Sequence, residues 1–199
     1  MEARLERSDF FSFLDLPRKL NIDMARLDER YRTLSRQFHP DFFYNATAAE
    51  RRVSLERSSF LNDAYRALRD PIKRIEYLLK IEGLAPKNEQ EASRQVPPAL
   101  LEEVFALNEE LDEVRGLRES GAARQQWQPR LERARQPIEQ KRVEHESELQ
   151  SLAAEWDALV DRGAPEGERK QILERLRDRF LERNYINNLL AGIEREMSA

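Results

Sequence analysis

Apolar residues recur at three- and four-residue intervals along most of the chain, the spacing that gathers side chains on one face of an α-helix. The first stripe consists of Met24, Leu27, Tyr31, Leu34 and Phe38, and the second of Val53, Phe60, Leu61, Ala64 and Leu68. A shorter third stripe consists of Ile72, Ile75, Leu78 and Leu79. No stretch alternates as a half-buried strand does, so the pattern predicts an all-α protein.

Capping residues indicate where these helices begin. Asp23 precedes the first stripe, and Thr47 and Glu50 have the spacing of a capping box ahead of the second. Asp70 followed by Pro71 opens the third, because proline suits the first helical position.

A short apolar segment precedes the first long helix. Ser8 is a candidate cap for a helix through about Leu16, and Pro17 ends it. Four large apolar residues make the segment unsuited to a free tail, so we expect it to pack as a lid.

Three more stripes follow in the C-terminal part. The first consists of Leu100, Val104, Leu107, Leu111 and Val114, and the second runs over about 122–160. The third consists of Ile172, Leu176, Phe180, Ile186, Leu190 and Ile193. Within 122–160 we expect a late start near Pro129 and a kink near Pro137. The prediction is an antiparallel three-helix bundle over 98–199, joined by a linker at 84–97 to an N-terminal domain at 1–83.

Composition narrows the class of protein. Of 199 residues, 36% are charged and none is cysteine, which excludes disulfides and thiolate chemistry. The N-terminal 82 residues hold 16 basic and 14 acidic residues, net +2, and the remainder holds 18 and 24, net −6, which sums to the overall −4. This balance indicates no nucleic-acid binding, and no apolar run is long enough for a membrane span. With no signal peptide apparent, we expect a cytoplasmic protein.

The tripeptide His39-Pro40-Asp41 stands where the first long helical stripe stops. Because proline cannot continue a helix and disfavours helical geometry in the residue before it, we expect a loop that exposes the imidazole and the carboxylate together. Phe42 and Phe43 follow, and we expect them to prop the loop against the helix pair.

Three arginines lie off the apolar stripe of the preceding helix, on the side opposite the core: Arg26, Arg30 and Arg36. Glu29 interrupts this basic surface. A solvated face is the alternative interpretation.

The helix after Pro98 carries apolar residues outside its core stripe. Leu101 and Phe105 lie about 100° and 140° around the helix from Leu100, and carboxylates border them, namely Glu102, Glu109 and Glu113. An apolar centre with a charged rim is typical of a partner-binding site. The alternative is a widened core face.

Enzyme chemistry is a weaker interpretation. A metal-dependent hydrolase would use His39 and Asp41, but no cluster of ligand-type residues at metal spacing and no phosphate-binding glycine loop accompanies them. His145, on an apolar stripe, is expected to pack rather than to bind a metal. We therefore expect neither catalysis nor a cofactor.

The N-terminal helices and their loop resemble a J-domain over roughly residues 8–82. The resemblance is carried by Tyr31-Arg32-Thr33-Leu34-Ser35-Arg36-Gln37-Phe38, His39-Pro40-Asp41, Leu61-Asn62-Asp63-Ala64-Tyr65, and Asp70-Pro71 with Arg74 and Tyr77. Ile75-Glu76-Tyr77-Leu78-Leu79, followed by a helical domain containing Asn108-Glu109-Glu110-Leu111-Asp112-Glu113, is similar to the HscB family of co-chaperones in iron–sulfur cluster biogenesis.

This resemblance implies two protein partners. One is an Hsp70 of the HscA type, whose ATPase the loop and the basic helix face stimulate, with His39, Pro40, Asp41, Arg26, Arg30 and Arg36 as the matching residues. The other is the scaffold protein IscU, bound through Leu101, Phe105, Glu109 and Glu113, joined by Phe180, which the stripe also assigns to the core. A different client is the alternative.

Three positions depart from the family. Phe42 replaces a frequent lysine, and Glu102 and Ala106 stand where the family often has methionine and glutamate. The last two departures fall on the client surface.

Overall fold

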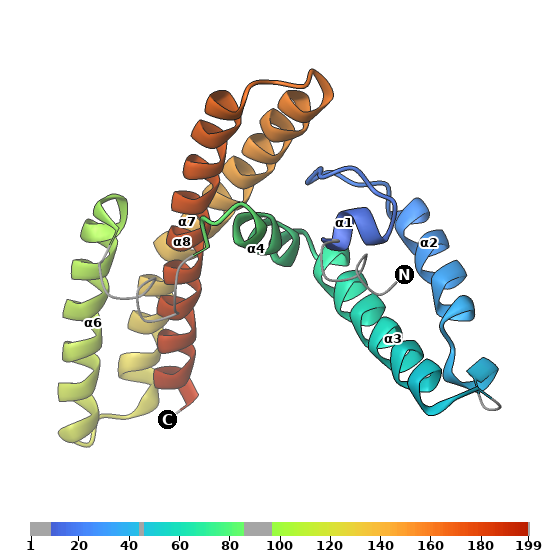
Figure 1. Ribbon diagram of the computed structural model, residues 1–199. Helices are drawn as coiled ribbons and strands as arrows, with labels where there is room; N and C mark the ends of the chain where they lie inside the picture. Colours follow the sequence, from blue (N-terminus) through green and yellow to red (C-terminus); the bar gives the residue numbers. More distant parts are fainter. Residues whose placement is uncertain (1–8, 44–45, 86–96, 199) are drawn as a thin grey trace. The chain divides into compact units, whose positions relative to one another are not determined.

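The computed structural model describes residues 9–43, 46–85 and 97–198, and every regular element in these ranges is a helix (Figure 1). The described chain forms two compact units. The N-terminal unit takes residues up to Ala85 together with Leu152–Glu174, and the bundle unit takes the described residues up to Ser151 and those from Arg175 onward. The boundaries expected from sequence stay a prediction, and most of the predicted linker lies outside the described residues.

The described residues of the N-terminal unit up to Ala85 form four α-helices and one short 3-10 helix. They are α1 (Phe10–Phe13), α2 (Met24–Gln37), η2 (Pro40–Phe43), α3 (Ala48–Arg69) and α4 (Pro71–Ile81). The predicted caps are confirmed: Asp23 accepts from two backbone N–H groups of α2, Thr47 and Glu50 form a capping box, and Asp70 caps α4 ahead of Pro71.

Helix α1 is shorter than predicted. Its N-cap is Asp9, whose carboxylate accepts from the Ser12 backbone N–H at 2.9 Å, while Ser8 lies outside the described residues. The helix stops at Phe13, and Asp15 then adopts a left-handed backbone with φ of +54°. The Phe10 N–H donates to the Tyr77 hydroxyl at 2.8 Å, so the segment packs on α4 as expected of a lid.

Helices α2 and α3 form a hairpin whose end carries η2 (Figure 1). The Tyr31 hydroxyl donates to Asn62 at 2.9 Å, and the Tyr65 hydroxyl donates to Asp28 at 2.8 Å. The two tyrosine rings stack with centroids 4.2 Å apart. The core beneath is apolar and comprises Phe11, Leu14, Leu16, Leu27, Phe38, Leu61, Ala64 and Leu68.

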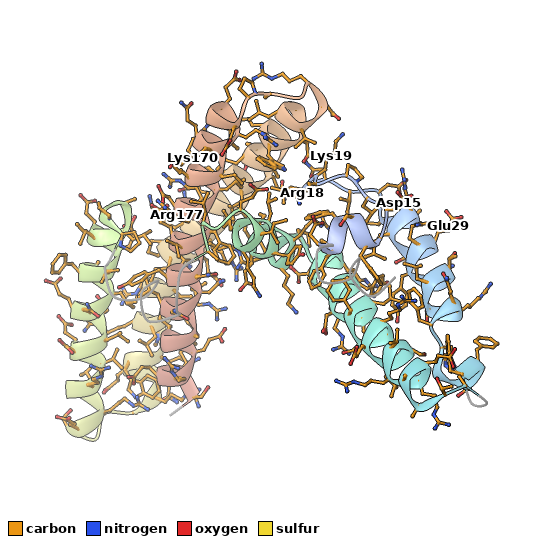
Figure 2. The ribbon with its side chains drawn as sticks, in the orientation of Figure 1. Asp15, Arg18, Lys19, Glu29, Lys170 and Arg177 are labelled. Atoms are coloured by element: carbon orange, nitrogen blue, oxygen red, sulfur yellow. The ribbon has the colours of Figure 1, made fainter. Side chains whose placement is uncertain are left out.

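The connection from α1 to α2, which carries Arg18 and Lys19 (Figure 2), binds the C-terminal end of α7 (Arg124–Asp161). The Asp157 carboxylate accepts from the backbone N–H groups of Leu20 at 2.6 Å and Asn21 at 2.8 Å. The Trp156 indole N–H donates to the Arg18 carbonyl at 2.8 Å. Both α7 residues are buried, so this stretch of α7 is part of the N-terminal unit.

The bundle unit is built on three helices, which confirms the predicted all-α architecture. They are α6 (Leu101–Glu119), introduced by η3 (Pro98–Leu100), with parts of α7 and of α8 (Glu166–Ser198). All three contribute to one core, made of Leu100, Val104, Leu107, Val114, Trp127, Leu131, Ile138, Ile186, Leu190 and Ile193.

Helix α7 passes through both of its prolines. The expectation of a late start near Pro129 is wrong, because the helix already begins at Arg124. Trp127 and Leu131 are buried on either side of Pro129, so packing holds the helix where its own hydrogen bonding is interrupted. Within the described ranges, no helix is long and apolar enough to cross a bilayer.

Candidate functional site

The loop after α2 is anchored at its first residue. Phe38 is buried, and its carbonyl accepts a hydrogen bond from the Ser54 hydroxyl of α3 at 2.9 Å. Beyond this anchor the chain turns into solvent: the side chains of His39 and Asp41 are 52% and 86% exposed. The predicted exposure of both groups is confirmed.

His39 and Asp41 are held beside one another by the backbone of η2. The Asp41 N–H donates to His39 Nδ1 at 3.3 Å, and the same nitrogen lies 3.5 Å from Asp41 Oδ2. The Phe42 N–H closes the turn by donating to the His39 carbonyl at 3.0 Å. Pro40 begins η2, and its side chain lies outside the described part of the structure. The loop therefore presents an imidazole and a carboxylate from one tight turn.

Phe42 does not prop the loop, contrary to expectation. Its side chain is 75% exposed, and its ring approaches His39 with centroids 6.2 Å apart. Phe43 is half-buried. The aromatic pair is thus divided, with one ring turned outward beside His39.

Two of the three predicted arginines are bound to the connection before α2. Arg26 donates to the Asp15 carbonyl at 3.0 Å, and Arg30 Nε donates to the Leu14 carbonyl at 3.2 Å. Both guanidinium groups also lie within 4 Å of the Asp15 carboxylate, at 3.5 and 3.8 Å. Figure 2 shows Asp15 ahead of α2 and Glu29 on that helix. Arg36 is exposed and has no ion pair within the described residues.

Sequence reasoning missed Ser54 and Asp15. Ser54 lies seven residues before the buried Leu61, so a polar residue at a core position of α3 was the available signal. No pattern in the sequence indicated a role for Asp15, because its pairing with Arg26 and Arg30 depends on the left-handed turn that follows α1.

The second predicted surface lies on α6. Leu101 is 41% exposed and Phe105 is 68% exposed, while Val104 and Leu107 beside them are buried. The alternative of a widened core face is therefore excluded. Glu109 is exposed on the same helix.

Glu113 pairs with Arg130 of α7, which also binds Glu110 at 2.9 Å. The Arg130 side-chain hydrogen bond lowers the pKa of Glu110. Phe180 is 4% exposed, as its place on the core stripe predicts, and so offers little surface to a partner.

The remaining histidine is enclosed in the bundle unit. His145 is 4% exposed, with Nδ1 3.4 Å from Glu182 Oε2. Burial lowers the pKa of His145, and the Glu182 carboxylate only partly opposes this. Over the described residues, no three side chains of the ligand-forming types gather as a metal site would require.

Two solved structures share this fold over most of their length. The chaperone HscB from Vibrio cholerae matches with a TM-score of 0.59 and 24% sequence identity, covering 94% of this chain and 96% of that one. The human co-chaperone protein HscB matches with a TM-score of 0.62 and 24% identity, covering 94% of this chain and 81% of that one. No family model matches the sequence. The chain therefore has the all-α fold of the HscB chaperones.

Proposed function

We propose that this protein is a J-domain co-chaperone that stimulates the ATPase of an HscA-type Hsp70 and delivers to it an IscU-type iron–sulfur scaffold protein. In this role it catalyses no reaction itself, requires no cofactor and acts in the cytoplasm. The observation that carries the proposal is the exposed His39 and Asp41 pair at the end of a packed helical hairpin, in a chain with the HscB fold.

The chemistry of the loop suits docking better than catalysis. Asp41 offers a well-exposed carboxylate for a charge-assisted hydrogen bond to an arginine of the Hsp70. Arg36 is the nearest exposed cation of α2, three residues before His39, and would complement an acidic surface. Arg26 and Arg30 are assigned a smaller share of the attraction to the Hsp70, since Asp15 already neutralises part of their charge.

The client surface is assigned to the exposed face of α6. Leu101 and Phe105 supply apolar area, and Glu109 and Glu113 supply charge at its edge. An apolar centre inside a polar rim is the usual anatomy of a specific interface. A co-chaperone for another client stays the alternative, and titration of the scaffold protein against the purified chain distinguishes the two.

The test of the Hsp70 function is ATPase stimulation. We expect His39→Gln and Asp41→Asn each to reduce the stimulated ATPase rate to the basal rate of the Hsp70 alone. Both side chains are exposed, so the circular dichroism spectrum and the melting temperature should stay unchanged.

Asp63→Asn is the matched control, because it also converts an exposed carboxylate to an amide, on α3 rather than in the loop. It should keep full stimulation. Normal stimulation by Asp41→Asn would refute the proposed docking role.

A further inference from the structure

A pocket opens in the N-terminal unit beside the start of α8. Its volume is about 410 Å³, and its lining comes from the connection before α2, the residues that follow α4 and the first turns of α8. All of these segments belong to the N-terminal unit. The lining includes none of the residues assigned above to the Hsp70 or to the scaffold protein. The proposed function therefore leaves this pocket without a role.

Three cations line the pocket. Arg18 comes from the connection before α2, and Arg169 and Lys170 come from α8; Figure 2 labels Arg18 and Lys170. Arg18 already has partners, since it pairs with Asp9 at 2.5 Å and with Glu82 at 3.4 Å. Arg169 and Lys170 are exposed, and neither has an ion pair within the described part of the chain. Two cations of the lining are thus available to a ligand.

The carboxylates of the lining do not cancel this positive charge. The Glu82 carboxylate is occupied by Arg18. Glu166 is the other lining carboxylate, and it opposes Arg169 and Lys170, so two cations and one carboxylate leave a net charge of +1. Glu166 is also the first residue of α8, and the unpaired N–H groups at a helix N-terminus carry about half a positive charge. The pocket therefore favours an anion.

The size and the apolar part of the pocket narrow the class of anion. Leu84 and Leu173 supply aliphatic lining. A water molecule occupies about 30 Å³ in the liquid, so a bare ion of similar size would fill only a small part of the space. No aromatic ring stands among the described lining residues, so nothing there would stack on a nucleotide base. A small aliphatic anion matches both observations.

The geometry points to a binding site for a small organic anion, a phosphoryl or carboxylate group carried on a short aliphatic chain. The anionic group binds Arg169 and Lys170, because a guanidinium can hold two of its oxygens and an ammonium adds a third donor and a second charge. The aliphatic chain packs on Leu84 and Leu173. This site is independent of the proposed function.

Calorimetric titration of the full chain at low salt tests the site. The probes are glycerol 3-phosphate and succinate, with glycerol as the neutral counterpart of the first. We expect one of the two anions to bind one site per chain with a dissociation constant of about 1 mM or tighter and to raise the melting temperature by mass action. The anion that binds more tightly identifies the phosphoryl or the carboxylate group, and glycerol should not bind.

Charge-neutral variants locate the bound anion. Arg169→Gln and Lys170→Gln should each weaken its binding about tenfold, the scale of one lost charge-assisted hydrogen bond. Both side chains are exposed, so the fold should be retained. Lys73→Gln is the matched control, because it removes an exposed lysine of α4 outside the pocket lining. It should bind the anion as the unaltered chain does.

Glu166→Gln gives a readout of opposite sign. Removing the carboxylate that opposes Arg169 and Lys170 should strengthen anion binding about two- to fivefold, as expected for an exposed charge. A loss of folding cannot produce such a gain, so this variant distinguishes a binding role from a structural one.

Three results would overturn the site. They are the absence of binding by both anions, binding that Arg169→Gln and Lys170→Gln leave unchanged, and binding that Glu166→Gln weakens. Because the titration contains neither Hsp70 nor scaffold protein, its failure would not affect the proposed function. Conversely, loss of the proposed function in the ATPase assay would leave this anion site standing.

Discussion

The two histidines of the chain stand in opposite surroundings. His39 is 52% exposed in the loop after α2, where its Nδ1 accepts the Asp41 N–H. His145 is enclosed in the bundle unit, and among the described residues its Nδ1 has no hydrogen-bond partner, although Glu182 is 3.4 Å away. Burial disfavours a charged imidazole there, which is why the pKa of His145 is lowered.

At this scale we predict a pH-dependent loss of stability through His145. Because its folded-state pKa lies below the unfolded value of about 6.5, its stabilising contribution is complete above that pH. The contribution is lost as the pH falls through the lower folded-state pKa, since the unfolded chain binds the proton more readily. Denaturant unfolding at a series of pH values measures the effect. As the pH falls, the free energy of unfolding of His145→Gln should decline less steeply than that of the unaltered chain.

His39→Gln is the matched control, because it removes the exposed histidine instead. Its free energy of unfolding should fall with decreasing pH as steeply as that of the unaltered chain. An identical pH profile for His145→Gln and the unaltered chain would contradict the prediction.

Helix α6 divides its apolar residues between two tasks. Val104, Leu107 and Val114 lie in the bundle core, while Leu101 and Phe105 stay exposed one residue away from the same stripe. A helix that keeps large apolar side chains in solvent has area available for a partner. The same element thus holds the bundle together and presents the proposed client surface.

The prediction for this element contrasts two phenylalanines. Phe105→Ala should weaken binding of the scaffold protein about tenfold and leave the melting temperature nearly unchanged, because the side chain is 68% exposed. Phe180→Ala should lower the free energy of unfolding by about 3–5 kcal/mol, since it leaves a cavity in the core. Titration calorimetry and denaturant unfolding measure the two effects, and a large stability loss in Phe105→Ala would count against a binding role.

At the scale of the whole molecule, α7 and α8 each contribute to both compact units. The end of α7 supplies Trp156 and Asp157 to the connection that precedes α2. Arg74 of α4 is buried at the same place and donates to the carbonyls of Leu20 and Leu68. The N-terminal unit is therefore completed by residues from the far part of the sequence.

We predict that Asp157→Ala destabilises the N-terminal unit by about 2–3 kcal/mol, because the buried Leu20 N–H and the partly buried Asn21 N–H lose a charged acceptor. Amide hydrogen exchange of Leu20 and Asn21 should accelerate. Asp161→Ala is the matched control: its carboxylate is 62% exposed in the pair with Lys19, so the cost should stay below about 1 kcal/mol. Equal effects of the two substitutions would contradict the assigned role of Asp157.

Local chemistry made much of this protein predictable from its sequence. The helices and their caps at Asp23, Thr47 and Asp70 follow from apolar periodicity and from side chains that bind the nearest backbone N–H groups. The exposed loop at His39 follows from the proline after it. These are interactions over a few residues, which a single stretch of sequence contains in full.

The tertiary structure decided what depends on distant residues. Asp15 reaches Arg26 and Arg30 only through a left-handed turn, and Asp157 finds its backbone partners 136 and 137 positions away. Sequence alone predicted the loop and placed Leu101 and Phe105 outside the core stripe of their helix. Only packing could show that both side chains are exposed and which charges are paired, since burial and pairing are set by long-range contacts that no local pattern records.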